Sequence, residues 1–267
     1  MLFSFSTFST FFAIVQGDIA NTAVWLSGAA YCDKNDYKTM QLAGPATGFI
    51  VSDVLYDPKT DLQGYTGVLN KSIFVAYRGS SSVLNWLSDF EVVKKPYLTY
   101  PECNCTVHKG FYTATTNLKE STIKSVQNLK AKYGYSDVIV TGHSLGAAIA
   151  QLIGMELSAV NIKNQVYNFG QPRIGDNKYA GFVNTITDDL WRFTHNKDSV
   201  PHLPPMSMGY LHSCREVFEL ESGELHMCSE VQCEDPKCAD QYSATDVDSD
   251  DHSIYLGHPL DCSKSTK

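Results

Sequence analysis

The sequence has no excess of positive charge, no internal repeat, no long low-complexity segment and no linker that would divide it. Lys and Arg total 21 against 29 for Asp and Glu, which gives a formal net charge of −8. This balance argues against a nucleic-acid partner and against a mainly electrostatic attraction to anionic membranes. The composition is globular: 43% of the 267 residues are hydrophobic and 19% are charged, which suits one large domain with a sizeable core.

The N-terminal stretch from Leu2 to Val15 is apolar and uncharged, but it is too short to span a bilayer comfortably. It ends close to Gly17 and Asp18, where cleavage by a signal peptidase is expected. The sequence therefore predicts a signal peptide over residues 1–17 and a single secreted domain over residues 18–267, although no basic residue precedes the apolar stretch. The alternatives are a buried N-terminal helix and an uncleaved anchor.

Eight cysteines, all of them beyond residue 17, also favour secretion, because an even number in an exported chain suggests disulfides. The run "CSEVQCEDPKC" lacks the paired C-x-x-C spacing of zinc sites, so we expect no metal at Cys228, Cys233 and Cys238. Together with Cys214 these three residues allow three pairings, and the sequence leaves the choice open.

Strand-like apolar runs alternate with amphipathic helical runs, which predicts an α/β protein with a mostly parallel central sheet. Strands are expected in "GFIVSDVLY", "SIFVAYRG", "SDVIVTG", "NQVYNFG" and "DLWRFTH", and "TGVLN" is expected to pair with either of the first two. Helices are expected over Ile19 to Tyr31, over Phe111 to Tyr133, directly after Ser144, and in "DNKYAGFVNTI". The polar, Cys-rich stretch from Glu221 to Asp251 is expected to form loops tied by disulfides.

Between a predicted strand and a predicted helix lies "GHSLG", which matches the pattern G-x-S-x-G. A tight strand-to-helix turn pushes a serine hydroxyl out of the backbone, and it crowds the neighbouring positions so that glycine fits best there. The helix that follows directs free backbone N–H groups toward developing negative charge. We therefore interpret Ser144 as a nucleophile and the amide of Leu145 as an oxyanion donor. The alternative is an ordinary structural turn.

A serine nucleophile needs a base and an acid, and the α/β-hydrolase order places the acid and then the histidine after the serine. Six histidines satisfy this order: His195, His202, His212, His226, His252 and His258. Asp198 follows a predicted strand, at a strand end where a loop can carry its carboxylate to an imidazole. Asp188 and Asp189 are weaker rivals because they precede that strand.

Five ordered motifs narrow the choice: "YRGSSSVLNWLSDF", "VTGHSLGAA", "YNFGQPRIGD", "THNKDSVPHLPP" and "DHSIYLG". Together they resemble the class 3 triacylglycerol lipase family, the filamentous-fungal type of secreted lipase with an α/β-hydrolase fold. The resemblance implies that Asp198 is the acid, that His252 is the base and that Ser80 is a second oxyanion donor. It also implies a disulfide that joins Cys32 to Cys262. His258 remains the rival base.

The stretch from Ser82 to Val93 carries large apolar side chains, among them Trp86, Leu87 and Phe90, between polar ones. An isolated amphipathic helix this short is marginal in water, so its apolar side must be buried somewhere. A helical lid over residues 82–93 that opens at an oil–water interface meets this need, and the family resemblance supports it. The alternative is a fixed surface helix.

The sequence thus predicts a secreted serine hydrolase that cleaves ester bonds of acylglycerols, a triacylglycerol lipase, through an acyl-enzyme. This chemistry needs no metal or organic cofactor, and the "DVDSDD" run before His252 lacks the glycine and terminal glutamate of an EF-hand. The expected partner is a lipid ester at an oil–water or membrane interface, with no nucleic acid and no stable protein partner. The alternatives are a phospholipase A1, a soluble-substrate esterase such as a feruloyl esterase, and a non-catalytic lipid-binding protein.

Overall fold

The protein is built around a central β-sheet. The structure is a computed structural model, and it describes residues 5–82, 91–187, 189–243 and 245–267. Among these residues the sheet has eight strands in the order β1-β2-β3-β6-β7-β8-β9-β10. In that order the strands are Ile50–Asp57, Leu62–Leu69, Ser72–Tyr77, Val138–His143, Gln165–Phe169, Leu190–His195, Glu216–Glu219 and Leu225–Met227. The pairs from β3 to β9 are parallel and the outer pairs are antiparallel, which is the mostly parallel sheet that the sequence predicts.

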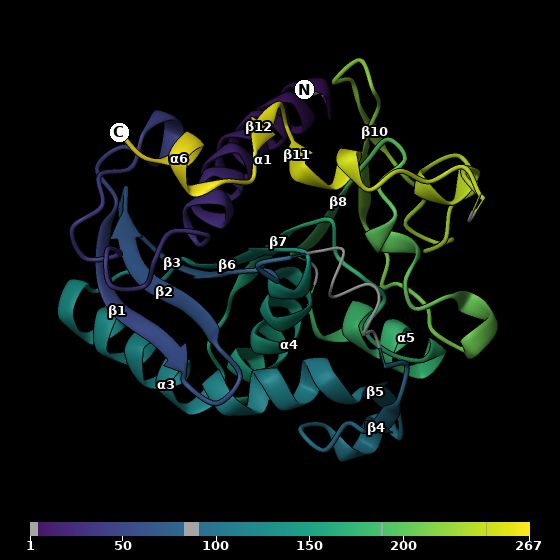
Figure 1. Ribbon diagram of the computed structural model, residues 1–267, viewed down its shortest axis with the longest axis horizontal. Coiled ribbons are helices and arrows are strands. Elements are labelled where there is room, and N and C mark those ends of the chain that lie inside the picture. The colour runs from purple at the N-terminus through teal and green to yellow at the C-terminus, as the bar shows by residue number, and fades with distance from the viewer. Residues whose placement is uncertain (1–4, 83–90, 188, 244) are drawn as a thin grey trace.

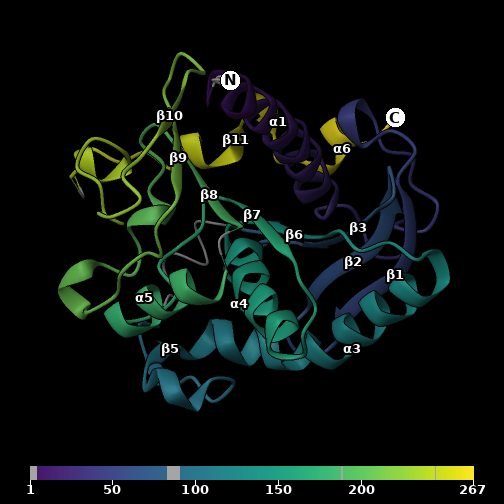
Figure 2. The same cartoon turned by 180° about the vertical axis from the view of Figure 1, so that it is seen from behind.

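Helices cover both faces of this sheet (Figures 1 and 2). On one face lies α1 (Phe5–Ala29), next to the C-terminal helix α6 (Cys262–Ser265) and the short hairpin of β11 (Ile254–Tyr255) and β12 (His258–Pro259). On the other face lie α3 (Lys109–Tyr133), α4 (Leu145–Ala159) and α5 (Asn177–Ile186), with the small hairpin of β4 (Lys94–Pro96) and β5 (Thr106–His108) beyond them. The expected strands and helices are therefore confirmed in type and close to their expected bounds, except that the helix expected over Ile19 to Tyr31 begins earlier, at Phe5.

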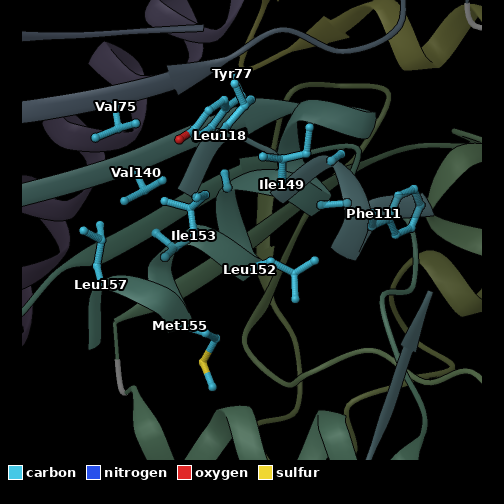
Figure 3. Close-up of a cluster of buried hydrophobic side chains, with 14 of the residues drawn as sticks. Val75, Tyr77, Phe111, Leu118, Val140, Ile149, Leu152, Ile153, Met155 and Leu157 are labelled. Carbon is cyan, nitrogen blue, oxygen red and sulfur yellow. The ribbon is translucent and has the colours of Figure 1, made fainter. Parts of the chain in front are cut away.

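Each face of the sheet has its own hydrophobic core. On the α3 and α4 side, Val75 and Val140 of the sheet pack against Ile149, Leu152 and other apolar side chains (Figure 3). The first turns of α4 are rich in alanine, and Ala147, Ala148 and Ala150 are fully buried. Small side chains let this helix approach the sheet closely, which fixes the position of its N-terminus.

The parallel register brings four functional segments to one edge of the sheet. Tyr77 pairs with Gly142, His143 pairs with Phe169, and Phe169 pairs with Phe193. Because parallel strands end at the same edge, the segments after β3, β6, β7 and β8 meet there. They contain Ser80, Ser144, Gly170 and Asp198, and the crevice at this edge is where open α/β sheets bind ligands.

The stretch from Glu221 to Asp251 is only partly as expected. Within the described residues it contains β10, which pairs antiparallel with β9 and extends the sheet, so the expectation of loops alone was wrong. The alternation that marks a strand covers only three residues here, and all three are exposed. Such a short edge strand depends on its partner more than on its own sequence.

Four disulfides join the cysteines of the described chain: Cys32–Cys262, Cys103–Cys105, Cys214–Cys233 and Cys228–Cys238. The first is the bridge that the family resemblance implied, and it ties the end of α1 to α6. The last two lie in the Cys-rich segment after β8. They resolve the pairing that the sequence left open.

Helix α1 runs without interruption from Phe5 to Ala29, through the expected cleavage position between Gly17 and Asp18. Its second half is buried against the sheet, with Ala23, Leu26 and Ala29 fully inaccessible. Among the described residues no helix is both long enough and apolar enough to cross a membrane. The assignment of residues 1–17 as a signal peptide stays a prediction.

Candidate active site

Ser144 occupies a strained turn between β6 and α4. Its φ of 59° and ψ of −127° lie in a region that side chains other than glycine rarely adopt. A Cβ atom at Gly142 would come within 2.3 Å of the Gly146 carbonyl oxygen, and one at Gly146 would come within 2.3 Å of the Tyr77 carbonyl oxygen. Both glycines of the G-x-S-x-G pattern are therefore required by backbone contacts around the serine.

The Ser144 side chain is fully buried, and its Oγ has no hydrogen-bond partner among the described residues. The N–H of Leu145 opens α4, so it has no acceptor within the helix. On the other side, a Cβ at Gly79 would lie 3.0 Å from Ser144 Cβ, which shows how closely the loop after β3 approaches. Ser80, the second predicted oxyanion donor, follows Gly79 in that loop and is half-buried.

Asp198 and His252 form a buried pair. The Nδ1–H of His252 donates to Asp198 Oδ2 at 2.7 Å, and both side chains are about 2% exposed. The hydroxyl of Tyr255 donates to the same oxygen, while the amide of Val200 donates to Asp198 Oδ1 at 2.8 Å. With Nδ1 so engaged, Nε2 of His252 is left without a partner among the described residues, as a base toward Ser144 requires.

Burial alone would raise the pKa of Asp198, but the attraction of His252 and the hydrogen bonds from His252, Tyr255 and Val200 outweigh it. The pKa of this carboxyl is therefore below its ordinary value, and the group is ionised at neutral pH. Burial also holds the pKa of the Tyr255 hydroxyl well above its ordinary value, so that it remains a donor. An ionised Asp198 keeps His252 in the tautomer that carries its proton on Nδ1.

The pair depends on a clamp between the turn after β8 and the segment before His252. Asp251 Oδ2 accepts hydrogen bonds from Asn196 Nδ2 at 3.0 Å and from the Lys197 amide at 3.1 Å. The Asp248 amide donates to the Lys197 carbonyl at 2.7 Å, and the amide next to Asp198 donates back to Asp248. These hydrogen bonds join two segments that are far apart in sequence, one around Asp198 and one that leads into His252.

Gly170 and His143 complete the support for His252. Gly170 has a φ of +58°, and a Cβ there would lie 2.8 Å from His252 Nδ1 and 3.0 Å from Asp198 Oδ2. The Nε2–H of His143 donates to the His252 carbonyl at 2.8 Å, and its Nδ1 accepts from the Tyr31 hydroxyl at 2.6 Å. Burial, and then the neighbouring charge of His252, hold the pKa of His143 well below its ordinary value. Sequence reasoning excluded His143 as the base but missed this positioning role.

The rival bases and acids lie elsewhere. His258 stacks on Trp25 at 4.1 Å between ring centroids and contacts Ser265 through Nε2 at 2.9 Å, on the α1 side of the sheet. Asp188 lies outside the described residues, and Asp189 precedes β8, at the opposite end of that strand from Asp198. The structure therefore pairs Asp198 with His252 and not with His258, and it holds the His252 carbonyl on His143, the residue before Ser144.

Other histidines have structural contacts. His195 Nδ1 donates to the Asp251 carbonyl at 2.9 Å, and His212 Nε2 donates to the Pro201 carbonyl at 2.8 Å. Within the described chain, Glu216, Cys228 and Cys238 are the one group of metal-capable side chains that converge, and those two cysteines are joined in a disulfide. They offer no thiolate to a metal.

The predicted lid residues Trp86, Leu87 and Phe90 lie outside the described residues. The residues at the C-terminal end of the predicted lid segment are held by hydrogen bonds. The Glu91 carbonyl accepts a hydrogen bond from His108, and the Val93 carbonyl accepts one from the Lys109 amide at 2.7 Å.

This fold and this Ser–His–Asp arrangement define a protein of the α/β-hydrolase class. The sequence profile of the family described as lipase (class 3) matches residues 74–208. The chain belongs to the class 3 lipase family.

Among curated relatives, the chain is 35% identical over 175 residues to a lipase of Rhizomucor miehei, and this match covers 62% of the chain and 46% of the relative. It is 34% identical over 225 residues to the secreted mono- and diacylglycerol lipase 1 of Fusarium solani, across 79% of the chain and 66% of that relative. The chain therefore spans about half to two thirds of the length of these relatives. Among solved structures, it is similar to a triacylglycerol lipase described as having a serine protease triad as its catalytic centre. That likeness has a TM-score of 0.83 and 25% identity, and it covers 90% of this chain and 94% of the other.

Proposed function

We propose that this chain is a secreted carboxylic ester hydrolase that cleaves acylglycerols, a triacylglycerol lipase. The observation that carries the proposal is the pair of buried atoms without partners among the described residues, Ser144 Oγ and His252 Nε2, with Nδ1 of the same histidine on Asp198. A buried hydroxyl and a buried ring nitrogen without partners are costly to the fold, which points to a catalytic use. The names of the relatives, lipase and secreted mono- and diacylglycerol lipase, support the same substrate class.

In the proposed mechanism, Ser144 Oγ attacks the ester carbonyl carbon while His252 Nε2 takes the hydroxyl proton. The N–H of Leu145, with the backbone N–H and hydroxyl of Ser80, stabilises the negative oxygen of the tetrahedral intermediate. The intermediate then expels the alcohol, which receives its proton from His252, and leaves an acyl group on Ser144. Water then attacks the acyl carbon while His252 takes one of its protons. The bond from the acyl carbon to Ser144 Oγ breaks, His252 returns the proton to Oγ, and the fatty acid is released. No cofactor enters these steps.

A cavity of about 410 Å³ next to Leu145 favours a fatty acyl chain over a polar acyl group. Leu62, Val93, Phe111 and Ala114 contribute to its lining. An apolar acyl chain that enters the cavity is transferred out of water at a position next to Leu145, one of the predicted oxyanion donors, and this transfer supplies binding energy for a lipid ester. This cavity is the reason to prefer a lipid over a methyl ferulate type of substrate.

Two further parts of the proposal concern the predicted lid and the N-terminal segment. Residues 82–93 are the proposed lid, and the hydrogen bonds at residues 91 and 93 would anchor its C-terminal end. Residues 1–17 are the proposed signal peptide, in keeping with relatives that are named as secreted. N-terminal sequencing of the protein recovered from culture medium tests the cleavage: Asp18 as the first residue supports it, and Met1 as the first residue contradicts it.

The activity is tested by a rate series on tributyrin, triolein, phosphatidylcholine and methyl ferulate, with wild type, Ser144→Ala and Ser222→Ala. Ser222 is an exposed loop serine and serves as the matched control. We expect fastest turnover of the acylglycerols, a loss of at least about 10⁴-fold in Ser144→Ala, and labelling of wild type and Ser222→Ala alone by an organophosphonate. Exclusive turnover of phosphatidylcholine or of methyl ferulate would replace the lipase by a phospholipase A1 or a feruloyl esterase. Full activity of Ser144→Ala would contradict the serine mechanism.

A further inference from the structure

A second cavity, of about 340 Å³, adjoins the reactive histidine. Ser80 and His252 contribute to its lining on the side of the proposed catalytic groups. Asp250, Ser253 and Asp261 contribute from the C-terminal segment, together with Ser249. His252 itself is 2% exposed, and its Nε2 has no partner among the described residues, so the cavity lies beside a histidine whose second ring nitrogen is not engaged.

The two cavities beside the site differ in charge. Glu91 and Lys109 both line the apolar cavity, and their charges oppose each other. In the His252 cavity the charged lining residues are the two carboxylates of Asp250 and Asp261, and no lysine or arginine of the described chain lines it. Both carboxylates belong to exposed residues, which lets them face a solvated ligand.

The chemistry of the proposed reaction decides which part of a substrate lies there. The histidine must return its proton to the departing alcohol, so that alcohol has to lie within hydrogen-bond reach of Nε2. The acyl chain is already assigned to the apolar cavity beside Leu145. The cavity that His252 lines is therefore left for the alcohol.

We propose that this acidic cavity receives the leaving alcohol and selects neutral, hydroxyl-bearing alcohols against anionic ones. The proposal rests on the ester hydrolase function stated above and adds its substrate class on the alcohol side. Free hydroxyls of a partial glyceride can donate to the carboxylates of Asp250 and Asp261 and can accept from the hydroxyl of Ser249. A phosphate on the same glycerol would meet two like charges, and no lysine or arginine among the described lining residues would balance it.

The test uses two soluble substrates that differ by one group, 1-butyroylglycerol and 1-butyroylglycerol 3-phosphate. Both have the same acyl chain and the same scissile ester, and neither forms a charged interface. The variant is D250N/D261N, in which the asparagine at 261 keeps the N-cap that Asp261 forms for α6. The control is E102Q/E120Q, which removes the same charge from exposed residues on the α3 side of the sheet.

For wild type we expect kcat/KM to favour the neutral ester by at least about tenfold near 10 mM salt, and the preference to shrink near 0.5 M salt because charges are screened. In D250N/D261N the preference should fall by about tenfold at low salt and lose most of its salt dependence. The control should match wild type in both respects.

Each other outcome is decisive. Equal turnover of the two esters by wild type, or an unchanged preference in D250N/D261N, overturns the selection by the acidic cavity while the hydrolase function stands. A control that behaves like D250N/D261N reduces the effect to overall charge and also overturns it. Absence of turnover with either ester, and with tributyrin, overturns the proposed function itself and this inference with it.

Discussion

Around Ser144 the constraint is steric, whereas around His252 it consists of hydrogen bonds. The serine turn is fixed because backbone atoms of β3, β6 and α4 leave no room for a side chain at Gly142 or Gly146. The acid and the histidine, 54 residues apart, are held by donors and acceptors from three segments. The comparison teaches that the serine turn cannot be altered without disturbing the central sheet, whereas the Asp198–His252 pair can be weakened by removing single hydrogen bonds.

The largest expected effect is that of a single methyl group in the serine turn. Gly146→Ala places a Cβ against the Tyr77 carbonyl and the Arg78 backbone, and neither can move without disturbing β3. We expect a loss of about 3 kcal/mol of stability and a correspondingly lower melting temperature. Gly181→Ala, in α5, has nothing within 4 Å and should be stabilised by about 0.5–1 kcal/mol. Thermal unfolding of both variants checks this, and a stable Gly146→Ala would refute the steric account.

Breaking the hydrogen-bonded half should abolish activity and leave the fold. Asp198→Asn removes the charge that holds the His252 tautomer, so we expect kcat to fall about 10⁴-fold while the circular dichroism spectrum remains that of wild type. Asp189→Asn, at the other end of β8, is the control and should keep its activity. Equal losses of kcat in the two variants would contradict the assignment of Asp198 as the acid and would leave Asp189 as a candidate.

A smaller effect is expected when one contact to the acid is removed. Tyr255→Phe keeps the buried ring but removes one donor to Asp198 Oδ2, and we expect about a tenfold loss of kcat/KM. Because this hydrogen bond helps to lower the pKa of Asp198, the acid limb of the pH–rate profile should move to higher pH in the variant. The control, Tyr65→Phe, loses a buried hydrogen bond to the Leu26 carbonyl far from the site. It should lose stability without this shift, and a matching shift in Tyr65→Phe would mean that Tyr255 is merely structural.

The smallest effect concerns His258, the rival base. Burial lowers its pKa from an ordinary 6.5 to about 4. The unfolded chain therefore takes up this proton first, so the stability that neutral His258 provides is complete above pH 6.5 and declines as the pH falls toward 4. In His258→Gln the melting temperature should depend less on pH in this window, by about 2–4 °C, with activity at pH 8 within about twofold of wild type. A loss of activity as deep as that of Asp198→Asn would reassign the base to His258.

How much the sequence predicted depended on how local each feature is. The Ser144 turn, the strand before it and the alanine-rich helix after it are encoded within one stretch, and the structure has them as expected. Asp198 and His252 could be predicted from the sequence only because each lies in a recognisable local motif. By contrast, β9 and β10 are too short to be predicted from their own sequence pattern. The hydrogen bond between Asn196 and Asp251 is not indicated by a motif in either segment.

The sequence by itself determined the α/β class of the fold and the glycine-flanked turn at Ser144, because helix and strand periodicities and the need for glycine are properties of short stretches. Only the tertiary structure decided that His252 and not His258 meets Asp198, that His143 holds the backbone of that histidine, and that an acidic cavity adjoins it. These are contacts between segments that are far apart in the sequence. They follow from the parallel register of β3, β6, β7 and β8, which brings the segments after these strands to one edge of the sheet.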